Sequence, residues 1–319
     1  MQMEKIKFRI GDPAHLETEL KGMLEKQLIL IGRYCTLAPE KPGEAVHEIR
    51  RCFKRSRAIL RLIRDATGYA AYFRENRNMR DLHRRLTPAR EADVFCQTLR
   101  DLRKNHHELL GDDWFLKVID DVRDQARTEL NQLLRDDTLE QISANVERSA
   151  ERIGHYHLRG EGFAVIDGGL KRIYRQGQRL THRAFFTQPD DMTLHNLRKR
   201  AKYLQYQVTL LRPLYPKLLK ATAKSLQQLT DTLGDYNDRA EAKEKLPALV
   251  DGSNGSGGKL EVLFGRLTAE QEVLRGEARH LAQKIYAEKP GQFTGRIRTY
   301  WETHARERAE NTEPIKTER

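Results

Sequence analysis

The chain has 319 residues, of which 38% are hydrophobic and 33% charged, a composition that suits amphipathic helices around a modest core and excludes wholesale disorder. The formal net charge is +12, which makes polyanions the natural class of partner: nucleic acid, an anionic membrane surface or an inorganic phosphate polymer. Three widely spaced cysteines without a CxxC pair favour neither a disulfide framework nor a zinc site.

The N-terminal sequence MQMEKIKFRIGD lacks the apolar segment that a secretory signal needs. No later run approaches the ~20 apolar residues that cross a bilayer. We therefore expect a cytoplasmic protein without a membrane partner.

Most of the chain follows the 3.6-residue spacing of helices, and the alternation typical of strands is scarce, so the predicted fold class is all-α. In chain order, helices are expected over residues 14–36, 44–65, 68–84, 89–109, 113–134, 138–155, 162–184, 191–212, 215–245, 260–288 and 291–309. The segment GSNGSGG (252–258) has the composition of a flexible linker, and residues 306–319 are expected to form a charged, disordered tail.

Two segments repeat the same pattern of residues. HEIRRCFK (47–54) aligns with HNLRKRAK (195–202), an offset of 148 positions. LTPARE (86–91) aligns more weakly with LGDYND (233–238), an offset of 147. Two matches at nearly one offset indicate a duplicated helical unit, with a first subdomain over residues 1–152 and a second over residues 153–305.

The first copy places its basic residues on one face of a helix. Steps of three and four residues bring these side chains into line: His47, Arg50, Lys54, Arg57 and Arg61. Val46, Ile49 and Phe53 lie about 100° further around the helix and predict a buried side. In the second copy His195, Arg198 and Lys202 share a face in the same way, and no acid occurs between positions 194 and 212.

The like charges on each of these faces repel one another. Like charges at i and i+4 destabilise an isolated helix by about 0.2–0.5 kcal/mol per pair, so the several pairs of the first copy sum to roughly 1 kcal/mol. A face that serves only solubility would mix both signs. The repeated pattern is better explained as one wall of a polyanion site than as a solvated cationic surface.

The histidines and a third basic helix leave alternatives open. Each histidine begins its basic face, where an imidazole either donates a hydrogen bond to an anion or simply packs and caps the helix. Lys171 and Arg175 recur at helical spacing and are further candidates, although an ordinary amphipathic helix explains them about equally well. No HExxH or comparable cluster is present, so no metal or cofactor is expected.

With these motifs the chain resembles the CHAD family, the conserved histidine α-helical domain, over roughly residues 10 to 305. The family's basic motif falls on His47, Arg50, Arg51, Lys54 and Arg57 in the first half, and on His195, Arg198, Lys199 and Lys202 in the second. Its acid-bearing motif falls on Arg90, Glu91 and Asp93, with Asn237 and Asp238 as the second-half counterpart. The chain departs from the family pattern at Thr87, where glycine is usual, at Glu91, where aspartate is usual, and at Gln205, the counterpart of Arg57.

The resemblance implies two four-helix subdomains related by a pseudo-twofold axis, with a basic groove or pore between them. It further implies binding of long-chain inorganic polyphosphate and association with polyphosphate granules, without catalysis. The carboxylates are expected to orient arginines, because an acid facing phosphate would repel it. Other polyanions stay possible partners.

Two rival functions remain. A nucleic-acid-binding protein fits the net charge, but the basic faces lack the interleaved aromatic residues that single-strand platforms use. A polyphosphate or triphosphate hydrolase would need Mg²⁺ held by carboxylates, and the basic faces carry only Glu48. The sequence therefore favours a non-enzymatic polyphosphate-binding module.

Overall fold

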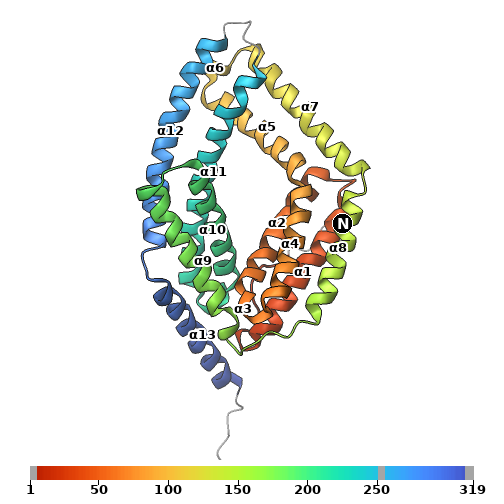
Figure 1. Ribbon diagram of the computed structural model, residues 1–319, viewed down its shortest axis with the longest axis vertical. Helices are drawn as coiled ribbons and strands as arrows, with labels where there is room; N and C mark the ends of the chain where they lie inside the picture. The colour runs from red at the N-terminus through yellow and green to blue at the C-terminus, as the bar shows by residue number, and fades with distance from the viewer. Residues whose placement is uncertain (1–5, 251–255, 313–319) are drawn as a thin grey trace, which may run out of the picture.

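The computed structural model describes residues 6–250 and 256–312, and this part of the chain folds as helices without a strand, which confirms the all-α prediction (Figure 1). The first half contains η1 (Pro13–His15), α1 (Leu16–Leu37), α2 (Pro42–Leu62), α3 (Arg64–Thr67), α4 (Tyr69–Arg85), α5 (Thr87–Asn105), α6 (His107–Leu110), α7 (Asp113–Arg135) and α8 (Thr138–Gly154). The second contains α9 (Ala164–His182), the π-helical turn η2 (Arg183–Thr187), α10 (Asp191–Leu210), η3 (Arg212–Leu214), α11 (Pro216–Leu249), α12 (Ser256–Ile285) and α13 (Pro290–Thr312).

The predicted helices are all present, with ends that differ by up to about four residues. Two of them are divided: Ile63 separates α2 from α3, and His106 separates α5 from α6. Gly68 then turns the chain from α3 into α4 with φ of +80°, a left-handed conformation that favours glycine.

The predicted disordered tail is wrong for residues 306–312, which continue α13 to Thr312. Alanine, arginine and glutamate dominate this stretch and are good helix formers. The remaining tail residues, 313–319, lie outside the described part of the chain. The predicted linker is likewise shorter, because α12 begins at Ser256, and residues 251–255 are not described.

The helices of the two halves contact each other in two places: α2 and α3 contact α9 and α10, and α5 and α6 contact α11 and α12. In the first half α1 packs against α2 and α8, and in the second α10 packs against α9 and α11 (Figure 1). The largest hydrophobic core takes residues from both halves, from Phe8 to Ile297. A smaller core joins α5 and α7 to the ends of α11 and α12, with Phe115 and Leu263 fully buried in it. The predicted boundary near residue 152 falls in the last turn of α8, but both cores cross it.

Gly168 and Gly169 bring α9 against the junction of α2 and α3. A Cβ atom at Gly169 would lie 1.9 Å from the carbonyl oxygen of Leu62, so this backbone approach needs glycine. Next to it, Arg172 forms an ion pair with Asp65 of α3, with 2.5 Å between Nη2 and Oδ1. These contacts fix the C-terminal end of α2 against the second half.

Candidate anion-binding site

Helix α2 carries the first of the two basic faces, defined as His47, Arg50, Lys54, Arg57 and Arg61. The neighbouring side of the helix is buried, with Ile49 and Phe53 fully inaccessible to solvent. Burial of one such large apolar side chain contributes about 1.5–3 kcal/mol. This exceeds the roughly 1 kcal/mol of like-charge repulsion along the face, so packing keeps the charged segment helical.

Neutral acceptors hold the arginines of the α2 basic face. Arg50 donates from Nη1 to Thr87 Oγ1 at 2.9 Å. Arg57 donates from Nε to Asn76 Oδ1 at 3.2 Å, and Arg61 donates to the same oxygen. Hydroxyl and amide oxygens orient a guanidinium without cancelling its charge. Arg51, beside this face, instead forms an ion pair with Glu48.

The α10 basic face, His195, Arg198, Lys199 and Lys202, is held in the same manner by α11. Arg198 donates from Nε to the carbonyl oxygen of Thr230 at 3.0 Å, and Lys202 lies 3.4 Å from Gln227 Oε1. His195 Nδ1 lies 3.3 Å from the side-chain nitrogen of Asn237. Asp231 lies near Lys202, and Asp235 and Asp238 lie near Arg198, so acids of α11 partly compensate the positive charge of this face.

The aligned arginines have aligned neighbours. Arg50 is bonded to Thr87, and the guanidinium of Arg198 lies against Gly234, where an added Cβ would be 3.1 Å from Nη2. Thr87 and Gly234 occupy equivalent positions of the second repeated segment. In each half, the arginine three residues after the histidine therefore lies against the second residue of the segment LTPARE or LGDYND.

The two basic faces lie close enough to influence each other's ionisation, and α2 and α10 are in direct contact. Burial and the positive charges of Arg50, Arg198 and Lys202 lower the pKa of Lys54 to about 8. Arg198 and Lys202 belong to α10, so charges of both halves converge on this amine. In the described part of the chain, the side-chain amine of Lys54 makes no hydrogen bond or ion pair.

Burial and neighbouring cations also lower the pKa of the histidines. For His47 the largest cause is burial, followed by Arg90, and for His195 it is burial, followed by Lys199. Both imidazoles are therefore mainly neutral at pH 7. His83 of α4 is more extreme, because burial together with Arg50 and Lys54 lowers its pKa to about 2.

Helix α4 adds cations that the sequence analysis did not assign to the site. Arg84 is among the charges that lower the pKa of Lys199, and Arg80 is among those that lower the pKa of Arg57, in both cases after burial. The spacing of Arg77, Arg80 and Arg84 by three and four residues could have indicated this third basic face.

Aromatic rings lie among the cations, so the prediction that aromatic residues are absent from the basic faces is wrong. The guanidinium carbons of Arg61 and Arg57 lie 4.3 and 6.0 Å from the ring centre of Tyr203. The amine of Lys202 lies 5.7 Å from the ring of Tyr206. These cation–π contacts stabilise positive charge at the place where α2 meets α10.

The predicted supporting residues Arg90, Glu91, Asp93 and Asp238 lie near the cations of the two basic faces. Arg90 forms an ion pair with Asp93, and it is also one of the charges that lower the pKa of His47, Arg50 and Lys54. Burial lowers the pKa of Arg50, and Glu91 acts in the opposite direction. In the second half burial raises the pKa of Asp238, and Arg198 opposes this shift.

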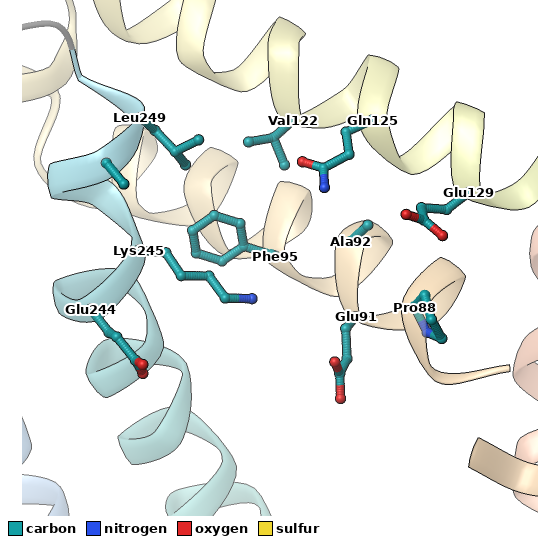
Figure 2. A pocket seen from close by; sticks show the side chains of 11 residues that line it. Pro88, Glu91, Ala92, Phe95, Val122, Gln125, Glu129, Glu244, Lys245 and Leu249 are labelled. Carbon is teal, nitrogen blue, oxygen red and sulfur yellow. The ribbon is translucent and has the colours of Figure 1, made fainter. Parts of the chain in front are cut away.

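Glu91 also lines a pocket of about 470 Å³ between α5, α7 and α11 (Figure 2). Glu129 of α7 and Glu244 of α11 line the same space, with Lys245 as the one cation among its lining residues. The predominance of acids means that this pocket does not extend the basic faces toward an anion.

Lys171, which was predicted to join the basic faces, lies beside Gly291 of α13. On α9, Gly169 and Arg172 face α2 and α3, whereas Tyr174 stacks on Phe293 of α13 at 4.2 Å. Lys171 lies on the side of α9 that faces α13, because its Nζ would be 3.8 Å from a Cβ added at Gly291. Arg175 is exposed, and no interaction among the described residues links it to either face.

The described residues contain no group of three or more His, Cys, Asp or Glu side chains that could hold a metal ion. None of their helices combines the length and the apolar character that a bilayer span requires.

Comparisons with known proteins agree with this architecture. The model of the CHAD domain family matches residues 24–247. The solved structure of PptA from Streptomyces chartreusis is similar, with a TM-score of 0.62 and 17% identity over 85% of this chain and 99% of that chain. The CHAD domain from the plant Ricinus communis gives a TM-score of 0.63 and 18% identity over 90% and 97%. At these identities the likeness concerns the fold, and no curated protein matches the sequence.

Proposed function

The chain belongs to the CHAD domain family, and from that membership and the geometry of its basic faces we propose that it binds long-chain inorganic polyphosphate between α2 and α10. The observation that carries the proposal is the surrounding of Lys54. Burial, reinforced by cations of both halves, lowers its pKa to about 8, and no acid among the described residues pairs with it. A bound polyanion would supply the missing negative charge.

The arrangement of donors suits a phosphate polymer. Arginine presents a planar fork that bridges two phosphate oxygens, and lysine acts as a mobile point charge. Identical groups repeat along polyphosphate, so a row of similar cations along two helices can bind it in many registers. Such binding would bring the protein to polyphosphate granules.

We propose binding without catalysis. Phosphoryl transfer normally relies on Mg²⁺ held by carboxylates, and two of the acids near the basic faces, Glu48 and Asp93, already pair with arginines. Incubation of the pure protein with polyphosphate and Mg²⁺ should release no phosphate above a protein-free blank. Steady release would make the protein a hydrolase.

Polyphosphate binding should take up protons near pH 8. Free Lys54 is about half protonated there, and a phosphate beside it would return the pKa toward 10.5, so Lys54 alone should take up about half a proton. Calorimetric titration at pH 8 in two buffers with different ionisation enthalpies measures this number. The variant Lys54→Gln should take up correspondingly less, and identical uptake by variant and wild type would contradict the role of Lys54.

Single-stranded nucleic acid is a second candidate, favoured by the aromatic rings. Besides Tyr203, the exposed rings of Tyr69 and Phe73 lie 4.3 Å apart, and Arg64 lies 5.7 Å from the first of them. Bases stack on such rings, whereas polyphosphate has no base to stack. Competition between the two polymers decides between the candidates.

A further inference from the structure

A second basic site lies beside the two faces, in a pocket between the first turns of α2 and the helices α5 and α7. Its volume is about 210 Å³, below the ~300–1,000 Å³ typical of sites for drug-sized ligands. It is lined by Gly43, Val46, Ala89, Arg90, Asp93, Cys96, Arg100, Arg123, Ala126, Arg127 and Leu130. Four arginines and one acid line this small space, and Asp120 and Asp124 beside it pair with Arg123 and Arg127, so a modest positive charge remains.

The arginines keep donors available. Arg90 pairs with Asp93 inside the pocket, Arg123 pairs through Nη1 with Asp120 at 2.8 Å, and Arg127 pairs through Nη1 with Asp124 at 3.5 Å. The Nε atom of Arg123 is buried and lacks a hydrogen-bond partner among the described residues. Arg100 is exposed and has no ion pair within the same residues. Arg123 Nε lies 3.8 Å from Asp124 Oδ1, and a buried donor of this kind is unfavourable unless an acceptor comes within hydrogen-bond distance.

The start of α2 adds to this environment. Gly43 lies in the first turn of the helix and lines the pocket, and Lys41 at the N-cap makes no capping hydrogen bond through its side chain. The first amide groups of a helix have no acceptor within it, and they carry the positive end of the helix dipole. They therefore reinforce the arginines in attracting an anion.

Arg90 connects the pocket to the α2 basic face. It lines the pocket, and it is also one of the charges felt by His47 and Lys54. A chain of phosphates bound along α2 can therefore reach the pocket past Arg90, and its last groups would meet Arg100, Arg123 and Arg127.

We propose that this pocket binds a diphosphate group, either free pyrophosphate or the end of a polyphosphate chain. Arginine forks from two helices fit the several oxygens of linked phosphates, and the small volume excludes a larger ligand. Only the chain-end version rests on the proposed function.

Titration with pyrophosphate alone tests the pocket. The wild type should bind it saturably, with a dissociation constant below about 1 mM. Arg100→Gln with Arg127→Gln should weaken binding at least 10-fold, since two charge-assisted hydrogen bonds are lost. The matched control is Lys104→Gln with Lys117→Gln, which removes two exposed charges from the same helices outside the pocket and should change affinity less than about twofold.

Lys54→Gln with Lys202→Gln serves as the second comparison and should leave pyrophosphate affinity within about threefold, because these lysines line the basic faces and not the pocket. The pocket assignment is overturned by absent wild-type binding, by equal binding of the arginine variant, or by equal losses in either lysine variant. Pyrophosphate binding that persists while long chains fail to bind would refute only the proposed function.

Binding of polyphosphate whose two ends are blocked as esters shows whether the pocket holds a chain end or free pyrophosphate. If the pocket holds the chain end, Arg100→Gln with Arg127→Gln weakens binding of open chains but not of blocked ones. If free pyrophosphate is the ligand, the arginine variant binds open and blocked chains as the wild type does.

Discussion

Replacing Lys54 and Lys202 by glutamine should weaken polyphosphate binding about 100-fold at ~0.15 M salt while stabilising the free protein. Each lysine is expected to make one charge-assisted hydrogen bond to phosphate, worth about 1.5 kcal/mol or more. The slope of log affinity against log salt should fall by about 1.4, taking ~0.7 per phosphate contact as for single strands. Calorimetric titration over a range of salt concentrations measures both quantities.

The gain in stability follows from the lowered pKa of Lys54. Its folded value of about 8 lies below the ordinary 10.5, so between these values the unfolded chain binds more protons, and stability increases with pH through that window. Below pH 8 the protonated amine destabilises the fold fully. Its removal should raise the free energy of unfolding at pH 7 by on the order of 1 kcal/mol, the scale of one pKa unit.

Weaker polyphosphate binding together with a higher free energy of unfolding distinguishes a binding role of the two lysines from a structural one. The control Lys104→Gln with Lys117→Gln removes the same charge from exposed positions and should reduce affinity less than about threefold. Equal losses in both double variants would mean general attraction to a basic protein. A double variant of Lys54 and Lys202 that is less stable than the wild type would refute the electrostatic description of Lys54.

Gly169→Ala should destabilise the protein by about 3 kcal/mol or more. The added methyl group would meet the carbonyl oxygen of Leu62 at 1.9 Å and that of Arg61 at 2.6 Å, and both are backbone atoms of α2. Overpacking of this kind typically costs about 1–3 kcal/mol, and backbone atoms yield less than side chains. Chemical denaturation followed by circular dichroism measures the loss.

The comparison for this variant is Gly265→Ala in α12, where an added Cβ meets nothing within 4 Å. Alanine is the better helix former by about 1 kcal/mol, so this exposed substitution should stabilise the protein. If Gly169→Ala is neutral or stabilising as well, α9 does not pack against α2 as described.

The sequence predicted the two basic faces because the side of a helix is local information. Steps of three and four residues place His47 and Lys54 together whatever the helix packs against, and the buried Ile49 and Phe53 follow from the same spacing. The all-α class has the same basis, since period 3.6 recurs along the chain.

Which helix packs against a given face depends on residues far away in the chain, so the neighbours of the faces could not be predicted from the sequence. Lys171 has the right spacing, but α9 has neighbours on two sides, and this residue faces α13. The acceptors Asn76 and Gln227 could not be found either, because their hydrogen bonds to basic residues join different helices. The basic pocket of α5 and α7 likewise depends on how those helices meet.

Titration of the protein with polyphosphate and with single-stranded DNA of equal phosphate number, in the same buffer at ~0.15 M salt, is the most direct test of a polyphosphate site between α2 and α10. We expect saturable binding of polyphosphate, at least 10-fold tighter than binding of DNA, and displacement of bound DNA by polyphosphate. Polyphosphate that binds no more tightly than DNA, or fails to displace it, would contradict the proposed function.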